Sequence, residues 1–431
     1  MSHGLAAIPW PNGKFYLFEG ATYRRWDAAT GALEDSGLDT ASAWHGLRTT
    51  APDAALWYGY GKAYFFYGSE YVRYDVGNDA VDPDYLPPNP PFQLSAWGLP
   101  WSDRIDAAVN WGNGKLYFFR DGEYVRYDVT QDRPDPNYPK PIDGNWPGVW
   151  TDRVDAALYT GGPYAWFFRG NDVRRFSIAA NTVDWSGTFG SLTLDPVPAG
   201  IWKAARDLTQ DEGHALLGYL IANGALSLGP GYAFPTLGAS TNVVVKPAAI
   251  THEYGTTTFI YANSASPQPL LDNVDQRMVV VLYRLVRWLN GGEPTVSEVR
   301  HLGIGHGQGA PNDCRNQGRA LDFSGVDGES QGTAFTRSVL KNWGNLPANG
   351  TPLRLDPVAD PLSYELFLKA FGFGTFECEC NGIGSGNSWP PKDIGDPGGY
   401  VIHPDYVDTG AQILRPDHQN HIHMQVGKTL A

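Results

Sequence analysis

Four stretches in the N-terminal half of the chain share one pattern of aromatic and polar positions. In each, aromatic residues alternate with other residues along two short segments. The three clearest copies contain Gly-Lys-x-Tyr-x-Phe followed by Tyr-x-Arg-Tyr-Asp or its equivalent, and the fourth copy is the weakest. The copies occupy residues 13–27, 61–75, 114–128 and 166–176. Alternation with a period of two predicts half-buried β-strands, with lysine and arginine on the opposite face.

A short apolar segment opens each copy, and three of these segments begin with Asp-Ala-Ala. The three aspartates are Asp53, Asp106 and Asp155, whereas the first copy has Leu5 at this position. The copies recur about every 50 residues, which is typical of propeller blades, because one such unit cannot bury its own face and neighbouring units must stack. The pattern therefore predicts four blades that close a ring, in preference to an ordinary β-sandwich.

A different pattern begins near residue 195, where the aromatic repeat stops. Residues 272–290 have apolar positions at helical spacing, an aspartate at the start and two glycines after the end, which predicts a helix. Strand character follows at 296–302, and a glycine-rich loop at 303–309. We therefore predict a multidomain chain with an all-β propeller at 1–195, a linker at 192–201 and an α+β domain at 202–431.

Charge and hydropathy exclude several classes of partner. The chain has a formal net charge of -14 and no basic run, which argues against nucleic acid or an anionic membrane as the main partner. The most apolar stretch, 278–289, is too short to span a bilayer and contains two arginines. Residues 1–7 lead into the first blade without the features of a signal peptide, so we expect a cytoplasmic protein or export by a non-classical route.

The combination of Asp-Ala-Ala, Gly-Lys-x-Tyr-x-Phe and Tyr-x-Arg-Tyr-Asp resembles the haemopexin repeat family over about residues 1–195. The resemblance implies a four-bladed propeller that recognises a protein or glycan partner. It also implies a central tunnel with a calcium or sodium ion near Asp53, Asp106 and Asp155. The alternative is that these aspartates cap the turns that start the inner strands. The chain departs from the family at Leu5, and it has no cysteine before Cys314 to form a ring-closing disulfide.

The three cysteines, Cys314, Cys378 and Cys380, all lie in the second domain. An odd number leaves at least one of them outside any intramolecular disulfide, and the sequence does not determine the pairing. A disulfide from Cys314 to one of the other two, or three thiols in a reducing compartment, are both compatible with the sequence.

Residues able to bind a metal ion gather in two segments of the second domain, 314–323 and 417–426. In an extended strand His421 and His423 point to the same face, so one metal ion or substrate can meet both. Asp322 stands in the apolar sequence Ala-Leu-Asp-Phe, and a buried carboxylate requires a partner such as a cation. The two segments together predict a metal or substrate site.

Gly-Arg-Ala-Leu-Asp at 318–322 and His-Ile-His at 421–423 resemble the D-Ala-D-Ala carboxypeptidase and murein endopeptidase group of zinc peptidases. The resemblance implies zinc bound by Asp322 and His423, with His421 as the base or electrostatic stabiliser. Asp417 or His418 would orient it from outside the ligand shell. The implied substrates are peptide amide bonds, those of peptidoglycan stem peptides in particular.

The chain departs from this group at the first zinc histidine, where Arg315 stands seven residues before Asp322. A guanidinium remains protonated and cannot bind zinc. Three interpretations follow: His306, or less favourably His301, completes the site; the fold is kept without metal and Arg315 pairs with Asp322; or the arginine is a variant of an active histidine. The alternative function is a non-catalytic binding or structural module of a toxin or injection apparatus.

Overall fold

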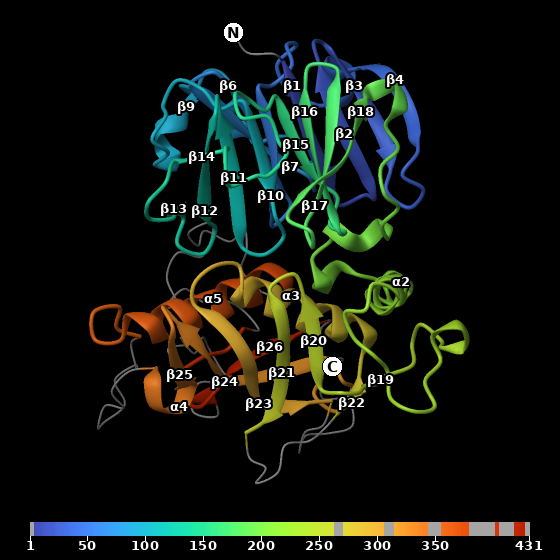
Figure 1. Cartoon of the computed structure of the whole chain (residues 1–431), viewed down its shortest axis with the longest axis vertical. Coiled ribbons are helices and arrows are strands. Elements are labelled where there is room, and N and C mark those ends of the chain that lie inside the picture. The colour runs from blue at the N-terminus through green and yellow to red at the C-terminus, as the bar shows by residue number, and fades with distance from the viewer. Residues whose placement is uncertain are drawn as a thin grey trace. The chain divides into compact units, whose positions relative to one another are not determined.

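The computed structural model describes residues 4–262, 270–305, 314–343, 355–378, 401–404 and 418–426. The chain divides into two compact units, Met1–Lys203 and Ala204–Ala431. Figure 1 shows the first unit in blue to green and the second in green to red. Among the described residues, no helix is both long and apolar enough to cross a membrane.

Unit 1 consists of four antiparallel sheets, one for each copy of the sequence repeat. The first sheet contains β1 (Leu5–Trp10), β2 (Lys14–Glu19), β3 (Thr22–Asp27) and β4 (Leu33–Asp39). The second contains β5 (Ala54–Gly59), β6 (Lys62–Tyr67), β7 (Glu70–Asp75), β8 (Ala80–Val81) and β9 (Phe92–Gln93). The third contains β10 (Ala107–Asn110), β11 (Lys115–Arg120), β12 (Glu123–Asp128), β13 (Arg133–Pro134) and β14 (Lys140–Pro141). The fourth contains β15 (Ala156–Tyr159), β16 (Tyr164–Arg169), β17 (Asp172–Ser177) and β18 (Thr182–Thr188).

The first strands of the four sheets lie next to one another in the cyclic order β1, β5, β10 and β15, and β15 contacts β1 again. Residues of β1 and β15 are buried along their whole length, as expected for strands that line the centre of a ring. This order confirms the predicted four-bladed arrangement. Short helical segments of unit 1 are α1 (Thr40–Ala43), η1 (Pro83–Tyr85), η2 (Leu94–Trp97), η3 (Phe189–Ser191) and η4 (Ala199–Trp202).

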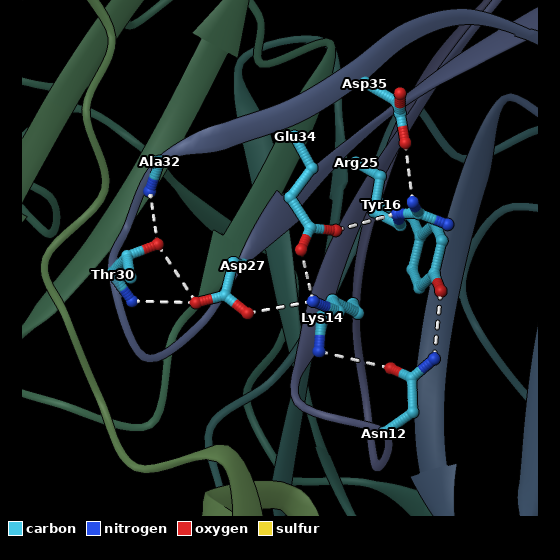
Figure 2. A network of polar contacts seen from close by, with 9 residues as sticks. All are labelled: Asn12, Lys14, Tyr16, Arg25, Asp27, Thr30, Ala32, Glu34 and Asp35. Carbon is cyan, nitrogen blue, oxygen red and sulfur yellow. Dashed lines mark hydrogen bonds and ion pairs between the residues drawn. The ribbon is translucent and has the colours of Figure 1, made fainter.

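A network of charged residues ties the strands of the first blade together (Figure 2). Nζ of Lys14 donates to Oδ2 of Asp27 at 2.8 Å and also to Glu34, which in turn accepts a hydrogen bond from Arg25. The other carboxylate oxygen of Asp27 accepts from the backbone N–H of Thr30 at 2.9 Å. The lysine of the repeat therefore joins the second strand to the third and fourth.

The same lysine network recurs in the second and third blades but not in the fourth. Lys62 bonds Asp75 and Asp82, and Lys115 bonds Asp128 and Asp135. In the fourth blade Tyr164 and Ser177 face each other at the positions of the lysine and the aspartate. The guanidinium of Arg175 lies 4.2 Å from the Tyr164 ring centre there. This exchange explains why the fourth copy of the repeat is the weakest.

The segment predicted as a linker instead closes the ring of unit 1. The backbone N–H groups of Leu194 and Val197 donate to the carbonyl oxygens of Gly31 and Ala28 in the first blade, at 3.1 and 2.8 Å. Both donor residues have buried side chains. The last blade is thus joined to the first by backbone hydrogen bonds, where the sequence has no cysteine for a disulfide.

Replacing Gly31 with alanine is expected to loosen this closure. Gly31 has a φ of +66°, and a Cβ atom there would stand 1.8 Å from the carbonyl oxygen of Leu194. Gly20→Ala is the matched control, because Gly20 has a similar φ of +61° and a Cβ atom there would have no neighbour within 4 Å. We expect a loss of about 1 kcal/mol of unfolding free energy for Gly20→Ala and about 3 kcal/mol for Gly31→Ala in denaturant titrations. Equal losses would show that the contact with Leu194 is unimportant.

Unit 2 is a mixed α/β region built on one large sheet. The sheet has the order β20 (Ala249–His252), β21 (Gly255–Tyr261), β23 (Thr295–Ile304), β24 (Ala320–Ser330) and β25 (Thr333–Ser338), and β26 (Ile422–Gln425) also pairs with β24. The pairing of β21 with β23 is parallel and the other pairings are antiparallel. A second, two-stranded sheet joins β19 (Val243–Val245) to β22 (Leu271–Val274).

The helices of unit 2 cover parts of the large sheet. They are α2 (Gln210–Ala222), α3 (Gln276–Leu289), α4 (Val339–Asn342) and α5 (Pro361–Glu377), with the short turns η5 (Ala205–Asp207) and η6 (Phe234–Thr236). Helix α3 packs against β20 and β23, and α5 packs against α3 and β26. The predicted helix at 272–290 begins four residues late, because 271–274 form a strand and Asp275, not Asp272, caps the helix by accepting from the N–H of Arg277.

Acid is expected to weaken unit 2 through His252. Burial lowers the pKa of His252 to about 4, and its Nδ1 accepts a hydrogen bond from the N–H of Tyr254, which requires the neutral ring. In the unfolded chain His252 has its ordinary pKa near 6.5, so between pH 6.5 and 4 the unfolded state binds more protons than the folded state. The free energy of unfolding is therefore unaffected by His252 above pH 6.5 and decreases as the pH falls from 6.5 to 4. We expect protonation of His252 to lower the free energy of unfolding by about 2 kcal/mol across this window, after allowance for the partial exposure of the side chain. Chemical denaturation of His252→Gln should show a shallower loss between pH 6.5 and 4 than the parent, and an unchanged slope would contradict this role.

Candidate metal centre

The pairing of β24 with β26 brings the two chemically distinctive segments together. The strands are antiparallel, and Asp322 lies directly opposite His423 in their register. The other edge of β26 is also paired, because His423 and Ile402 exchange backbone hydrogen bonds of 2.8 and 3.2 Å. Hydrogen bonds on both edges and burial of all four strand residues fix the position of His423.

Asp322 is the centre of a set of charged and polar contacts. Its Oδ1 lies 2.8 Å from Nδ1 of His423 and 3.4 Å from Nε2 of His421, and its Oδ2 accepts from Nη1 of Arg315 at 3.1 Å. Burial opposes ionisation of this carboxyl, but the hydrogen bond from His423 and the nearby imidazoles and guanidinium outweigh it and lower the pKa of Asp322 well below its usual value. The carboxylate is therefore held ionised inside the protein.

Three buried imidazoles form a group that could hold a metal ion. In the described part of the chain, His418, His421 and His423 each offer one nitrogen, and these nitrogens lie within 4.8 Å of one another. The ring centres of His418 and His421 are 4.7 Å apart, and those of His418 and His423 are 5.7 Å apart. Imidazole nitrogen is a preferred ligand of zinc. From the sequence we expect only an orienting role for His418, although its place in Asp-His-x-x-His-x-His is a recognisable signal for a third imidazole.

The protonation state of His421 suits a cation. Burial lowers the pKa of His421 to about 4, so its ring is neutral at pH 7 and keeps a lone pair. Its Nε2 is buried and has no hydrogen-bond partner among the described residues. Nε2 of His423 lies 3.1 Å from Oε1 of Gln425. A metal ion at that nitrogen would displace the Gln425 contact and leave the one to Asp322 in place, as in carboxylate–histidine–metal arrangements.

The candidates for a missing ligand lie in different surroundings. Arg315 pairs with Asp322, as one of the three interpretations of the sequence requires. His301 lies on β23 in register with Phe323, and its buried Nδ1 has no hydrogen-bond partner within the described ranges. Burial lowers the pKa of His301 to about 4, against the opposing charge of Asp322. His306 and Asp417, predicted as a metal ligand and as an orienting residue, lie outside the described residues, as does Cys380.

The three aspartates of the propeller engage turns inside their own blades. Oδ2 of Asp53 accepts from the backbone N–H of Gly68 at 2.6 Å, and Asp106 and Asp155 make the corresponding bonds at 2.7 Å to the residue fifteen positions later. The other oxygen of Asp106 and of Asp155 accepts from the arginine two residues before it. These contacts agree with a turn-capping role, although the turn is the one between the second and third strands.

Comparison with known proteins concerns the N-terminal unit. Residues 52–100 and 105–151, which span the second and third blades, match the Hemopexin family model. Matrix metalloproteinase-25 of Homo sapiens is 42% identical over 57 residues, which are 13% of this chain and 10% of that protein. Macrophage metalloelastase of Rattus norvegicus is 44% identical over 64 residues, 14% of each chain. The chain thus spans only about a tenth of the length of these curated relatives.

Among solved structures, a plant albumin from Cicer arietinum showing hemagglutination aligns with 44% of this chain and 94% of its own, at 19% identity and a TM-score of 0.37. The seed albumin LS24 from Lathyrus sativus aligns with 43% of this chain and 91% of its own, at 17% identity and a TM-score of 0.37. The matched family model lies wholly within unit 1, and it identifies haemopexin repeats there.

Proposed function

We propose that unit 2 is a zinc-binding hydrolase domain that acts on peptide amide bonds, with the stem peptides of peptidoglycan as its substrate class. The observation that carries the proposal is the buried group of His418, His421 and His423 beside the ionised Asp322. Imidazole nitrogens next to one carboxylate match the nitrogen and oxygen ligands that zinc takes in proteins. The peptide substrate rests on the resemblance of 318–322 and 421–423 to zinc peptidases.

Each residue of the site has a distinct part in this proposal. Zinc, when bound, supplies a Lewis acid and activates water for attack on a carbonyl group. Asp322 holds the Nδ1–H of His423 and fixes the direction of its ring. In the arrangement in which His418 and His423 hold the metal, the neutral ring of His421, whose buried Nε2 lies 3.4 Å from Oδ1 of Asp322, can accept a proton from a water molecule. Once protonated, the same ring can stabilise negative charge on the substrate oxygen.

Unit 1 would supply recognition in this arrangement. Its haemopexin repeats form a ring of four sheets, and we propose that this ring binds a protein or glycan that carries the substrate. A tunnel cation held by carbonyl groups belongs to the same proposal.

A second function is favoured by one contact. Arg315 occupies the position of the first zinc histidine in the resembling peptidases and makes an ion pair with Asp322. A guanidinium in this place neutralises the carboxylate and repels a dication. If this effect prevails, unit 2 has kept the fold without the metal and serves as a binding or structural module of a toxin or injection apparatus.

Elemental analysis of the intact protein, purified without chelator and then dialysed against zinc, separates the two functions. The first predicts near-stoichiometric zinc in the parent and its loss in His423→Ala. His252→Ala is the control, because His252 is a partly buried histidine of the same unit that lies on β20, outside the imidazole group. Zinc in neither the parent nor the control would favour the binding module. Zinc in the parent would be followed by assays of stem-peptide cleavage.

A further inference from the structure

Two asparagines fasten the chain on either side of residues 306–313 to the edge of β22. The side-chain Nδ2 of Asn273 donates to the carbonyl oxygen of Gly305 at 2.6 Å and to that of Asn316 at 3.0 Å. Nδ2 of Asn242 donates to Oδ1 of Asn273 at 2.8 Å and to the carbonyl oxygen of Gln317 at 3.0 Å. The side chains of Asn242 and Asn273, called here the asparagine clamp, thus bind the backbone at Gly305 and at 316–317.

The backbone around the asparagine clamp leaves no room for a side chain at Gly305 or Gly318. Asn273 has a φ of +54°, in the left-handed region that asparagine tolerates better than most residues. A Cβ atom on Gly318 would stand 2.1 Å from the carbonyl oxygen of Asn273, and one on Gly305 would stand 2.2 Å from that of Asp272. The two glycines therefore allow the backbones to approach closely enough for the asparagine bonds to form.

The turn at 314–318, which the asparagine clamp holds, leads directly into the metal centre. Gly318 N–H donates to the carbonyl oxygen of Arg315 at 3.1 Å, and Arg319 N–H donates to that of Cys314 at 2.8 Å, which closes the turn that carries Arg315. Arg319 and Val426 are joined by backbone and side-chain bonds of 2.9 and 3.3 Å at the end of β26. The turn is therefore held between the asparagine clamp on one side and the histidine strand on the other.

We infer that Asn273 and Asn242 are positioning residues of the metal centre: they fix the turn 314–318, and with it Arg315 and the start of β24, against the rest of unit 2. A hydrogen-bonded amide fits this task because one Nδ2 can bind two carbonyl groups at once. The link to metal binding rests on the function proposed above, whereas the anchoring of the turn does not. Loss of the clamp should open the turn locally without unfolding the unit.

The experiment uses Cys314 as a reporter, because it lies in the clamped turn and is buried. Cys378→Ala and Cys380→Ala make it the one thiol of the chain, which has three cysteines. In this background we compare Asn273→Gly, which keeps the left-handed backbone accessible, with Asn290→Gly. Asn290→Gly is the matched control, because it also removes an asparagine side chain that binds backbone groups. The side chain of Asn290 makes three hydrogen bonds of 2.8 to 3.1 Å to backbone groups of α3 and β23, away from the turn.

Two quantities are measured for each variant: the rate at which a thiol reagent modifies Cys314 under native conditions, and the dissociation constant for zinc. The free energy of unfolding of each variant is measured as well, so that both quantities can be compared with global stability. For Asn273→Gly we expect Cys314 to react about tenfold faster than the change in global unfolding predicts. We also expect the dissociation constant for zinc to rise about tenfold, as it does when other residues that orient metal ligands are replaced. For Asn290→Gly both quantities should follow the unfolding free energy alone. A Cys314 rate in Asn273→Gly that also follows global unfolding overturns the inference. A parent without zinc, combined with the expected thiol rates, overturns the proposed function and leaves the anchoring intact.

Discussion

Lys115→Met is expected to destabilise unit 1 by about 3 to 5 kcal/mol, since it removes the cation from a buried ion pair and leaves the carboxylates behind. Nζ of Lys115 lies 2.6 Å from Asp128 and 3.0 Å from Asp135. The side chains of Lys115 and Asp128 are each only 5% exposed. Asp135 keeps its bond to Arg126, and Asp128 keeps the backbone N–H of Gln131, but Asp128 loses the charge of the ammonium group beside it.

Lys14→Met is the matched control for this prediction. Lys14 holds the same position of the repeat in the first blade, but its side chain and that of Asp27 are each 24% exposed. Water can therefore solvate the carboxylates that remain, and we expect a loss of about 1 kcal/mol or less. Denaturant unfolding followed by tryptophan fluorescence measures both variants. Similar losses for the two lysines would mean that burial does not set the strength of the repeated network.

Arg315→His is expected to strengthen zinc binding by at least about tenfold, because it adds an imidazole ligand and removes a positive charge from the metal centre. The guanidinium now occupies Oδ2 of Asp322 at 3.1 Å. Removal of the guanidinium frees Oδ2 of Asp322. The other carboxylate oxygen of Asp322 already contacts His421 and His423. The variant should also cleave stem peptides faster than the parent if the proposed function holds.

Arg315→Met separates the two contributions to this gain. Methionine removes the charge of the guanidinium but does not add an imidazole, so any increase in zinc affinity that it causes is electrostatic. We expect Arg315→His to bind zinc more tightly than Arg315→Met, as measured by competition with a chelator of known affinity. Equal affinities would mean that residue 315 does not reach the metal ion, and no gain in either variant would count against a zinc site beside Asp322.

The fold of unit 1 follows closely from the sequence. Aromatic residues at every second position require strands with one buried face, and four copies of similar length require blades that stack. The sequence did not reveal that residues 192–201 close the ring. Their two prolines and the loss of the repeat suggested a linker, whereas Leu194 and Val197 are buried and bonded to the first blade. Such pairing depends on contacts between residues far apart in the chain, which local patterns do not record.

In unit 2 the sequence predicted the existence of a long helix but not its start. Asp272 and Asp275 are both suitable N-caps by residue type. Asp275 is the N-cap in the structure because 271–274 form a strand that pairs with β19. The pairing of two distant strands thus decided the boundary. Asn273, whose left-handed backbone and side-chain bonds form half of the asparagine clamp, was hidden inside the segment that looked helical.

By itself the sequence determined the repeat architecture, and it singled out Asp322, His421 and His423 as candidate site residues and Arg315 as an unusual one, because these depend on residue type and short spacing. Only the tertiary structure decided which groups meet. The register of β24 and β26 joins Asp322 to His423, about a hundred positions apart, and the folded chain also pairs Arg315 with Asp322 and places His418 beside His421 and His423. Distances between side chains arise from strand pairing and burial across the whole unit, and no local stretch of sequence contains that information.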